Sequence, residues 1–319
     1  TATALAIDHD QAKDLLTIGR HQALRINTLK SDEHTLEELT DLGWQGSQFA
    51  WYEHGYSIDK GLEAVRDSRL VQDGKVYIQN PASWLPVILL NPQPNETILD
   101  VCSAPGGKTS HIAQATNNQA EITANDNSHH RLIKLKTNLG RLGVTSVDFT
   151  LFDAQYLTKK LGNISFDKIL LDAPCSGEGM MQLDNDKDLA YWSVAQIKRL
   201  QILQRKLMNQ AWQLLKPGGT LVYSTCTIAP EENEANIDHF LKRHEDAQLI
   251  DHGFTNILPN ITSPVLNWNN KQYSPILAKT LRLKPSRQIE AFFVAKIAKS
   301  SNPAQSAYSG IGYPAISKL

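Results

Sequence analysis

Residues 98–109 read ILDVCSAPGGKT, a short apolar run that ends in Asp100 and continues into a Gly-Gly turn. A buried strand that stops at a glycine turn before a helix is typical of a cradle for a nucleotide cofactor. Such cradles lie at the carboxyl ends of parallel strands, so the ends of neighbouring strands face the same crevice. Two further strand ends, DAPCSG at 172–177 and STCT at 224–227, each carry a cysteine. The chemistry of the chain is therefore expected at this edge.

From residue 97 onward, apolar runs alternate with helical segments. A helix after Asp126 would place Leu132, Leu135 and Leu139 on one stripe, and a longer helix at 194–215 repeats this spacing. Alternating strands and helices predict an α/β domain with a parallel sheet and helices on both faces. The strands are expected at 97–102, 121–126, 147–154, 167–174, 219–226 and 291–297.

The segment before this domain has another pattern. A strand at 24–30, a helix that Gly43 ends, and strands at 48–51 and 56–58 predict a small α+β domain. Since Pro92 and Pro94 break the chain, we expect a small domain at 1–92 and a catalytic domain at 93–299. Residues 300–319, rich in Ser, Ala, Gly and Pro, are expected to form a loose tail.

Basic residues gather in two stretches although the formal net charge is −1. Residues 129–141 and 271–299 are both rich in Lys and Arg, which suits a polyanion such as nucleic acid, although solvated helix faces would look the same. In the small domain, Arg25, Asn27 and Lys30 could touch phosphate or ribose, or they could form the polar face of a strand.

The cysteines and the apolar runs limit the class of protein. Three cysteines without a CxxC pair argue for free thiols, and His129-His130 has no ligand spacing around it, so we expect no metal. The sequence has no apolar run of the roughly 20 residues that span a bilayer and no signal-peptide pattern, which predicts a cytoplasmic protein without a membrane partner.

The turn at 102–108 excludes a Walker-type ATP site and weakens the case for a dinucleotide site. A Walker loop needs a glycine where this chain has Cys102, and the GxGxxG pattern of dinucleotide-binding oxidoreductases is absent. A cofactor held by carboxylates remains. Asp126 could accept from ribose hydroxyls and Asp153 from an adenine amino group, which fits S-adenosylmethionine, although either aspartate could instead cap a strand end.

Cys175 and Cys226 suggest the reaction. A thiolate beside the cofactor can add to carbon 6 of cytosine, which makes carbon 5 nucleophilic enough to accept a methyl group. Asp172 could hydrogen-bond the base, which has to leave its stack to reach such a pocket. Spacing alone does not choose between Cys175 and Cys226 as the nucleophile.

Several long motifs in order resemble the NOL1/NOP2/Sun family of RNA cytosine-5 methyltransferases. These are ILDVCSAPGGKT, DAPCSGEGM and YSTCTIAPEENE, with RINTLK at 25–30, VYIQNPASWLP at 76–86 and the terminal FFVAK. The resemblance implies a Rossmann-like methyltransferase domain with a mostly parallel seven-stranded sheet. It also implies that Cys226 is the nucleophile and that Cys175 assists product release.

The resemblance further implies a set of cofactor contacts and a substrate. The S-adenosylmethionine contacts are Cys102, Ser103, Ala104, Pro105, Gly106, Gly107, Lys108, Asp126, Asp153 and Asp172. The expected substrate is a structured RNA, ribosomal RNA first and transfer RNA next, bound by a monomer. Ser103 and Ala291 depart from the family's usual alanine and glycine. Two alternatives remain open: a non-catalytic RNA-binding scaffold, and a DNA methyltransferase, in which Cys175 would be the nucleophile.

Overall fold

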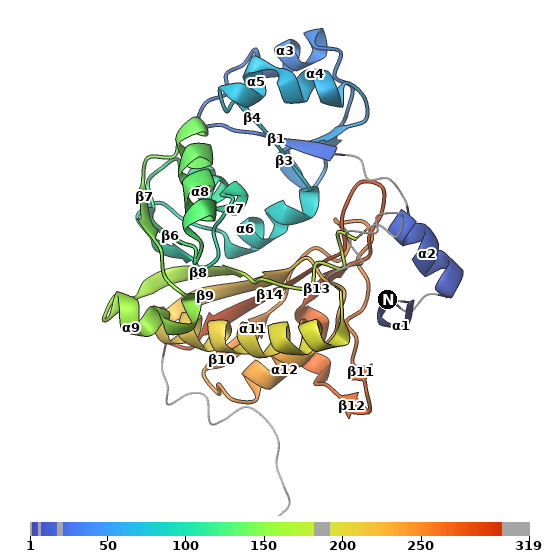
Figure 1. Ribbon diagram of the computed structural model, residues 1–319, viewed down its shortest axis with the longest axis vertical. Helices are drawn as coiled ribbons and strands as arrows, with labels where there is room; N and C mark the ends of the chain where they lie inside the picture. Colours follow the sequence, from blue (N-terminus) through green and yellow to red (C-terminus); the bar gives the residue numbers. More distant parts are fainter. Residues whose placement is uncertain (1, 6–7, 18–21, 182–191, 302–319) are drawn as a thin grey trace, which may run out of the picture.

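The computed structural model describes residues 2–5, 8–17, 22–181 and 192–301, so most of the expected tail at 300–319 lies outside the described residues. Two sheets organise the chain, a smaller one at the top of Figure 1 and a larger one below it. Within the described ranges, no helix has the length and apolar character needed to cross a membrane.

The smaller sheet is antiparallel, with the strand order β2-β3-β1-β4. Leu24, Leu39 and Val65 form its core with their neighbours. The strands and the helix expected here are present, with shifted ends. The elements are β1 (Gln22–Ile26), α3 (Thr35–Asp41), β2 (Gln48–Phe49), β3 (Tyr52–Ile58), α4 (Leu62–Asp67), α5 (Arg69–Gln72) and β4 (Val76–Gln79).

Two of the residues considered for RNA contact in this sheet are buried. The Arg25 guanidinium is 0% exposed and donates to Gln114 and Ser110 of a helix in the larger part of the chain. The Asn27 amide donates to the carbonyls of Gly74 and Leu142. Arg25 and Asn27 therefore join the two parts of the chain, so neither of the two alternatives left open for them, contact with RNA or an exposed polar strand face, describes their side chains.

The larger sheet has the strand order β10-β14-β9-β8-β5-β6-β7, and β13 pairs with β14 as an eighth strand. Neighbours from β9 to β7 are parallel, whereas β14 joins β9 in the antiparallel sense. The predicted mostly parallel sheet is confirmed. Its strands are β5 (Thr97–Asp100), β6 (Glu121–Asn125), β7 (Val147–Thr150), β8 (Phe166–Asp172), β9 (Leu215–Thr225), β10 (Ala247–Ile250), β13 (Leu281–Leu283) and β14 (Phe292–Lys299).

Successive strand residues point to opposite faces of this sheet. Ile98 and Leu170 pack in one apolar core, whereas the adjacent Leu99 and Leu171 pack in the other. Figure 1 shows α6, α7 and α8 on the first face and α11 and α12 on the second. The covering helices are α6 (Leu85–Leu90), α7 (Gly107–Ala115), α8 (His129–Arg141), α9 (Leu157–Leu161), α11 (Val194–Leu214) and α12 (Glu234–Leu241).

The remaining elements are short. Residues 252–288 were expected to be irregular, but they include a two-stranded ribbon, a 3-10 turn and β13, which are too short for periodicity to indicate. These and the other short elements are α1 (Ala2–Leu5), α2 (His9–Thr17), η1 (Pro81–Trp84), η2 (Ala154–Tyr156), β11 (Asn267–Trp268), β12 (Lys271–Gln272) and η3 (Pro275–Lys279).

A buried arginine, Arg282, connects the N-terminal segment to the C-terminal part of the larger sheet. Arg282 is 1% exposed, and its Nη1 lies 3.0 Å from Oε1 of Glu234. Its Nη2 donates to the carbonyls of Ala4 at 3.2 Å and Ile228 at 2.5 Å. The guanidinium thereby anchors the turn that follows the carboxyl end of β9.

Candidate active site

The turn after β5 is held on both sides. Thr109 Oγ1 donates to Asp100 Oδ2 at 2.7 Å, and the backbone N–H of Ser103 donates to the Asn125 carbonyl at the end of β6 at 2.9 Å. Gly106 has a φ of 106°, and a Cβ there would lie 2.9 Å from Leu135 Cδ1 of α8. A side chain is therefore excluded at this position by both backbone conformation and space.

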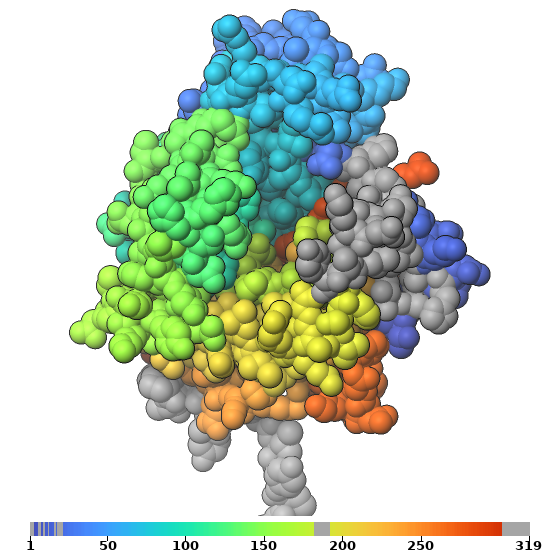
Figure 2. All heavy atoms as spheres, in the orientation of Figure 1, coloured from blue at the N-terminus to red at the C-terminus, as the bar shows by residue number. Residues whose placement is uncertain are grey.

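Two cavities adjoin at the carboxyl ends of the parallel strands, where Figure 2 shows a hollow between the green segment with α8 and the yellow segment with α11. The thiol cavity, about 300 Å³, is lined by Asp126, Arg131, Asp153, Cys175, Cys226 and others. The lysine cavity, about 180 Å³, is lined by Tyr77, Gln79, Ser83, Asp100, Lys108 and others. Cys102, Ala104 and Asp172 line both.

The two thiols meet, as their positions at neighbouring strand ends predicted. Cys175 Sγ lies 3.2 Å from Cys226 Sγ, and both residues are partly buried. The hydrogen bond with Cys226, together with burial, raises the pKa of Cys175 well above its usual value. Cys175 therefore keeps its proton at neutral pH and can donate it.

The loop that carries Cys175 is closed against the loop that carries Cys226. The backbone N–H of Gly179 donates to the Cys226 carbonyl at 2.9 Å. A Cβ at Gly179 would lie 2.3 Å from the Ala291 carbonyl oxygen and 2.7 Å from that of Cys226, so this approach requires glycine.

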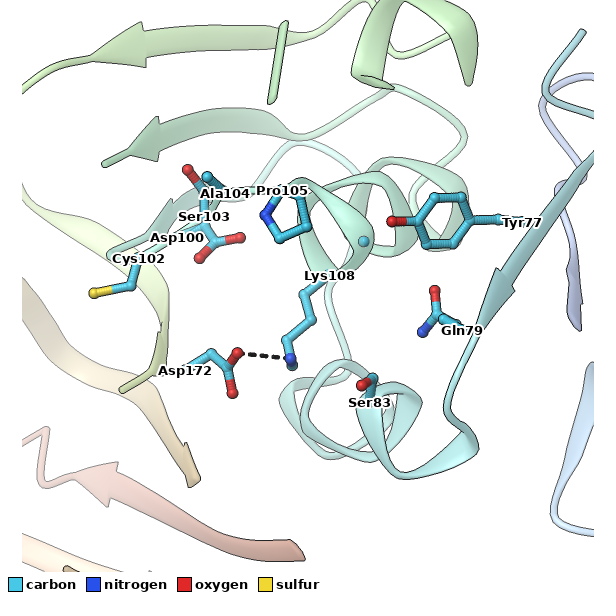
Figure 3. A pocket seen from close by; sticks show the side chains of 11 residues that line it. Tyr77, Gln79, Ser83, Asp100, Cys102, Ser103, Ala104, Pro105, Lys108 and Asp172 are labelled. Carbon is cyan, nitrogen blue, oxygen red and sulfur yellow. Dashed lines mark hydrogen bonds and ion pairs between the residues drawn. The ribbon is translucent and has the colours of Figure 1, made fainter. Parts of the chain in front are cut away.

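Asp172 lies between the two cavities and binds one charged partner and one neutral partner. Its Oδ2 accepts from Lys108 Nζ at 2.6 Å, the dashed line in Figure 3, and its Oδ1 accepts from Ser224 Oγ at 2.7 Å. Burial opposes the charge of Lys108, but the attraction of Asp172 raises the pKa of Lys108 above its usual value. Lys108 and Asp172 thus form an ion pair. The side chain of Asp172 remains 30% exposed.

The two carboxylates expected to hold the nucleoside differ in access. Asp126 accepts from the backbone N–H groups of Ala104 at 3.3 Å and Ser128 at 3.0 Å, and Arg131 Nη1 lies 3.4 Å from its Oδ2. Its side chain is only 1% exposed, so little of its surface is open to a ribose. Asp153 is exposed and caps η2 by accepting from the N–H of Gln155 at 2.9 Å.

Glu232 is a buried carboxyl that sequence reasoning did not single out. It is 0% exposed and accepts from the backbone N–H of Ser176 at 3.1 Å and from Gln204 Nε2 at 2.7 Å. Gln204 also donates to the Pro174 carbonyl, so the group supports the residues on both sides of Cys175. Burial raises the pKa of Glu232 to about 7. The acid-rich run PEENE contained it, but nothing in that run indicates which acid turns inward.

Two further groups lining the lysine cavity lack partners within the described chain. Both amide atoms of Gln79 and the Oδ1 atom of Asp100 are buried without a hydrogen bond. Burial raises the pKa of Asp100 to about 7. Buried polar atoms without partners are uncommon, so these indicate a place where a ligand makes hydrogen bonds. The residues present therefore fit a polar organic cofactor, and the described ranges contain no cluster of metal-binding side chains.

Comparison with known proteins was consistent across sequence and structure. A tRNA (cytosine(49)-C(5))-methyltransferase of Pyrococcus abyssi is 37% identical over 285 residues, 87% of this chain and 88% of that protein. A Ribosomal RNA small subunit methyltransferase F of Aeromonas salmonicida is 39% identical over 246 residues, 75% of this chain. The chain spans about half, 51%, of the length of that relative.

A solved structure described as a methyltransferase homolog protein from Pyrococcus horikoshii superposes with a TM-score of 0.77 at 30% identity, covering 93% of this chain and 97% of that one. The family model described as 16S rRNA methyltransferase RsmB/F matches residues 87–298. The resemblance found in the sequence is thus confirmed. The chain belongs to the 16S rRNA methyltransferase RsmB/F family, whose members are S-adenosylmethionine-dependent enzymes.

Proposed function

We propose that the protein methylates carbon 5 of a cytosine in structured RNA and that Cys226 forms a covalent bond to the base during the reaction. The observation that carries this proposal is the approach of Cys226 Sγ and Cys175 Sγ to 3.2 Å at a cavity that also contains Asp172. Ribosomal RNA is the first candidate substrate, because the matching family model and the Aeromonas salmonicida relative are named for it, and transfer RNA is the second, after the name of the Pyrococcus abyssi relative.

In this proposal the thiol cavity and the adjoining turn hold S-adenosylmethionine. The contacts are Asp126 and Asp153 on the nucleoside, Asp172, and the turn from Cys102 to Lys108. When bound, the cofactor supplies an electrophilic methyl group. Arg131 Nη1 lies 3.4 Å from Asp126 Oδ2, so a ribose hydroxyl that binds Asp126 has to compete with this guanidinium.

The two thiols divide the work on the base. The Cys226 thiolate adds to carbon 6, and the resulting enamine makes carbon 5 the nucleophile that takes the methyl group. Water then takes the proton from carbon 5, the electrons of that carbon–hydrogen bond form the double bond between carbons 5 and 6, and the Cys226 thiolate leaves carbon 6, which restores the aromatic ring. Cys175 keeps a proton beside Cys226 and can return it to the departing sulfur.

Asp172 and Lys108 act on the polar edge of the same base. A carboxyl that hydrogen-bonds the ring nitrogen and amino group of cytosine favours addition at carbon 6, because it stabilises the charge that the ring takes up. Ser224 fixes the orientation of Asp172 and Lys108 balances its charge. Residues 1–92 are proposed to bind the surrounding RNA, and the enzyme to act as a cytoplasmic monomer.

The test uses the Cys175→Ser variant, expressed in cells and analysed on a denaturing gel with and without ribonuclease. If Cys175 assists release, a ribonuclease-sensitive adduct accumulates, and sequencing its RNA identifies the substrate. The Cys175→Ser/Cys226→Ala double variant must lack the adduct. An adduct formed by the Cys226→Ala variant instead would show that Cys175 is the nucleophile, which is the arrangement expected of a DNA methyltransferase. Failure of the unaltered protein to bind S-adenosylmethionine in calorimetry would favour a non-catalytic scaffold.

A further inference from the structure

The residues that follow the two thiols are joined to each other. Ser176 comes directly after Cys175, and Thr227 comes directly after Cys226. The hydroxyl oxygens of Ser176 and Thr227 lie 2.7 Å apart, and Thr227 is 1% exposed. Thr227 Oγ1 also lies 3.3 Å from Glu178 Oε2. The position of Thr227 therefore helps to set how Cys226 lies against Cys175.

Glu178 sets the direction of these hydrogen bonds. A carboxylate can only accept, so Thr227 donates its hydroxyl hydrogen to Glu178 and has to accept from Ser176. The Thr227 oxygen also accepts from the backbone N–H of Ala229 at 3.2 Å. Glu178 is 9% exposed, so its side chain is largely shielded from water. Glu178 thereby orders the link between the two loops that carry the thiols.

The second oxygen of Glu178 holds an exposed indole. Trp192 Nε1 donates to Glu178 Oε1 at 2.6 Å, and Trp192 is 42% exposed. Met180, two residues after Glu178, is 49% exposed. A single exposed apolar side chain is ordinary, but here two lie around one nearly buried carboxylate, and the indole ring is held by its N–H. The loop after Cys175 therefore carries an ordered aromatic surface close to the thiol cavity.

We propose that Trp192 is a contact for a nucleobase of the RNA and that Glu178 is a positioning residue that couples this contact to the two thiols. The inference rests on the proposed function, in which one cytosine leaves its stack to enter the thiol cavity. The bases beside an extruded nucleotide lose a stacking neighbour, and aromatic side chains bind such unstacked bases. Trp192 suits this role because its partner Glu178 is three residues from Cys175, which lines the cavity.

The coupling depends on the two oxygens of Glu178, which serve different donors. Thr227 donates to one and Trp192 to the other. A base that stacks on the indole restricts the ring, and the ring in turn restricts the carboxylate that holds Thr227. RNA bound at Trp192 thus favours the arrangement in which Cys175 Sγ lies 3.2 Å from Cys226 Sγ. This is the arrangement in which Cys175 can return a proton to the departing sulfur.

Glu178→Gln tests the positioning role. The amide has a single acceptor atom, so Thr227 and Trp192 can no longer both donate to it. We expect kcat to fall by about tenfold, the loss of roughly one hydrogen bond, while the KM for RNA stays within about threefold. Because the thiols are less well aligned, a ribonuclease-sensitive adduct should accumulate, to a smaller extent than in Cys175→Ser. A merely structural role for Glu178 would lower activity without accumulation of the adduct.

Two changes at Trp192 test the RNA contact. Trp192→Phe keeps an aromatic face but loses the N–H, and Trp192→Leu loses both. Loss of one base–aromatic stack should raise the KM for RNA by about tenfold in Trp192→Leu, whereas Trp192→Phe should raise it by less than about threefold. Trp192→Phe also removes a donor to Glu178, so it should accumulate adduct as Glu178→Gln does.

The matched controls are Glu231→Gln and Trp268→Phe, because Trp268 Nε1 donates to Glu231 Oε1 at 2.8 Å in a similar pair outside both cavities. Both should keep kcat and KM within about twofold and form no adduct. If Glu178→Gln does not fold, Thr227→Val removes the same link and should accumulate the same adduct.

The inference is overturned if Trp192→Leu leaves the KM for RNA unchanged, or if Glu178→Gln forms no adduct in cells where Cys175→Ser does. If Cys175→Ser forms no adduct and the unaltered protein does not bind S-adenosylmethionine, the proposed function itself has failed and the inference fails with it.

Discussion

Asp172 and Glu232 are two carboxyl groups close to the thiol pair, and they differ in exposure and in hydrogen-bond partners. Asp172 is 30% exposed, has a lysine partner and lines both cavities. Glu232 is fully buried, accepts from the neutral Ser176 N–H and Gln204 amide, and lines neither cavity. Burial raises the pKa of Glu232 to about 7.

The difference separates two tasks. A carboxylate with a cation partner and an open side can meet a substrate at little cost in desolvation, and this describes Asp172. A buried carboxyl with only neutral donors is suited to fixing backbone, and Glu232 holds the loop on both sides of Cys175. We expect changes at Asp172 to appear in rate and changes at Glu232 to appear in stability.

Replacing Asp172 with Asn should have the largest effect. The carboxylate that favours attack on the base is lost and Lys108 is left without its ion-pair partner, so kcat should fall by about 10³-fold, within the range for acid–base groups. The measurement is the rate at which labelled methyl groups pass from S-adenosylmethionine to RNA, with both substrates at saturating concentration.

Asp167→Asn is the control for that variant, because Asp167 lies in the same strand and pairs with Lys216 outside both cavities. Its kcat should stay within about twofold of the unaltered protein, as is usual away from a site. A loss of less than tenfold in Asp172→Asn would contradict a role for Asp172 in the reaction.

Replacing Glu232 with Gln should change how stability depends on pH. Because folding raises the pKa of Glu232 from 4.5 to about 7, its contribution to stability is full below pH 4.5 and is lost as pH rises to about 7. The loss amounts to about 3 kcal/mol over that interval. In Glu232→Gln, this part of the decline in the free energy of unfolding should be absent, as urea titrations at pH 4.5 and pH 7.5 can measure.

Asp100 contributes a similar slope, since its pKa is also raised to about 7, but it does so in both proteins and cancels in the comparison. Glu231→Gln provides the matched control, because that neighbour instead accepts from Trp268 Nε1 at 2.8 Å. It should keep the slope of the unaltered protein. Identical slopes in Glu232→Gln and the unaltered protein would show that Glu232 is ionised in the folded state.

Replacing Ser224 with Ala should have the smallest effect. Ser224 Oγ donates to Asp172 Oδ1 at 2.7 Å, and loss of this hydrogen bond leaves the Asp172 side chain less well oriented. We expect kcat/KM to fall by about tenfold, which corresponds to roughly 1.4 kcal/mol. In the Asp172→Asn variant, the further change Ser224→Ala should lower kcat/KM only slightly. If the two losses in kcat/KM are fully additive, Ser224 does not act through Asp172.

The parts of the site that the sequence predicted depend on strand ends. Cys175 and Cys226 follow two runs that form neighbouring parallel strands, so their meeting required only the rule that such ends share an edge. Asp126 reached the thiol cavity for the same reason. The apolar periodicity of α8 likewise predicted which leucines are buried.

The parts that sequence reasoning missed depend on contacts between distant segments. Arg25 looks like the polar face of a strand until Gln114 and Ser110 are brought against it by α7. Gln79 is the last residue of a short strand of the smaller sheet, and only the packing of that strand on the Gly107 turn brings it to the lysine cavity. No local pattern contains such information.

The contacts of Arg282 connect parts of the chain that are synthesised at different times. The guanidinium joins Ala4, Ile228 and Glu234, and 278 positions separate its partner Ala4 from Arg282 itself. During synthesis, the turn beyond Cys226 leaves the ribosome before Arg282, which follows Ile228 by 54 positions. A growing chain thus carries both thiols before the residue that anchors the turn after Cys226 has been made.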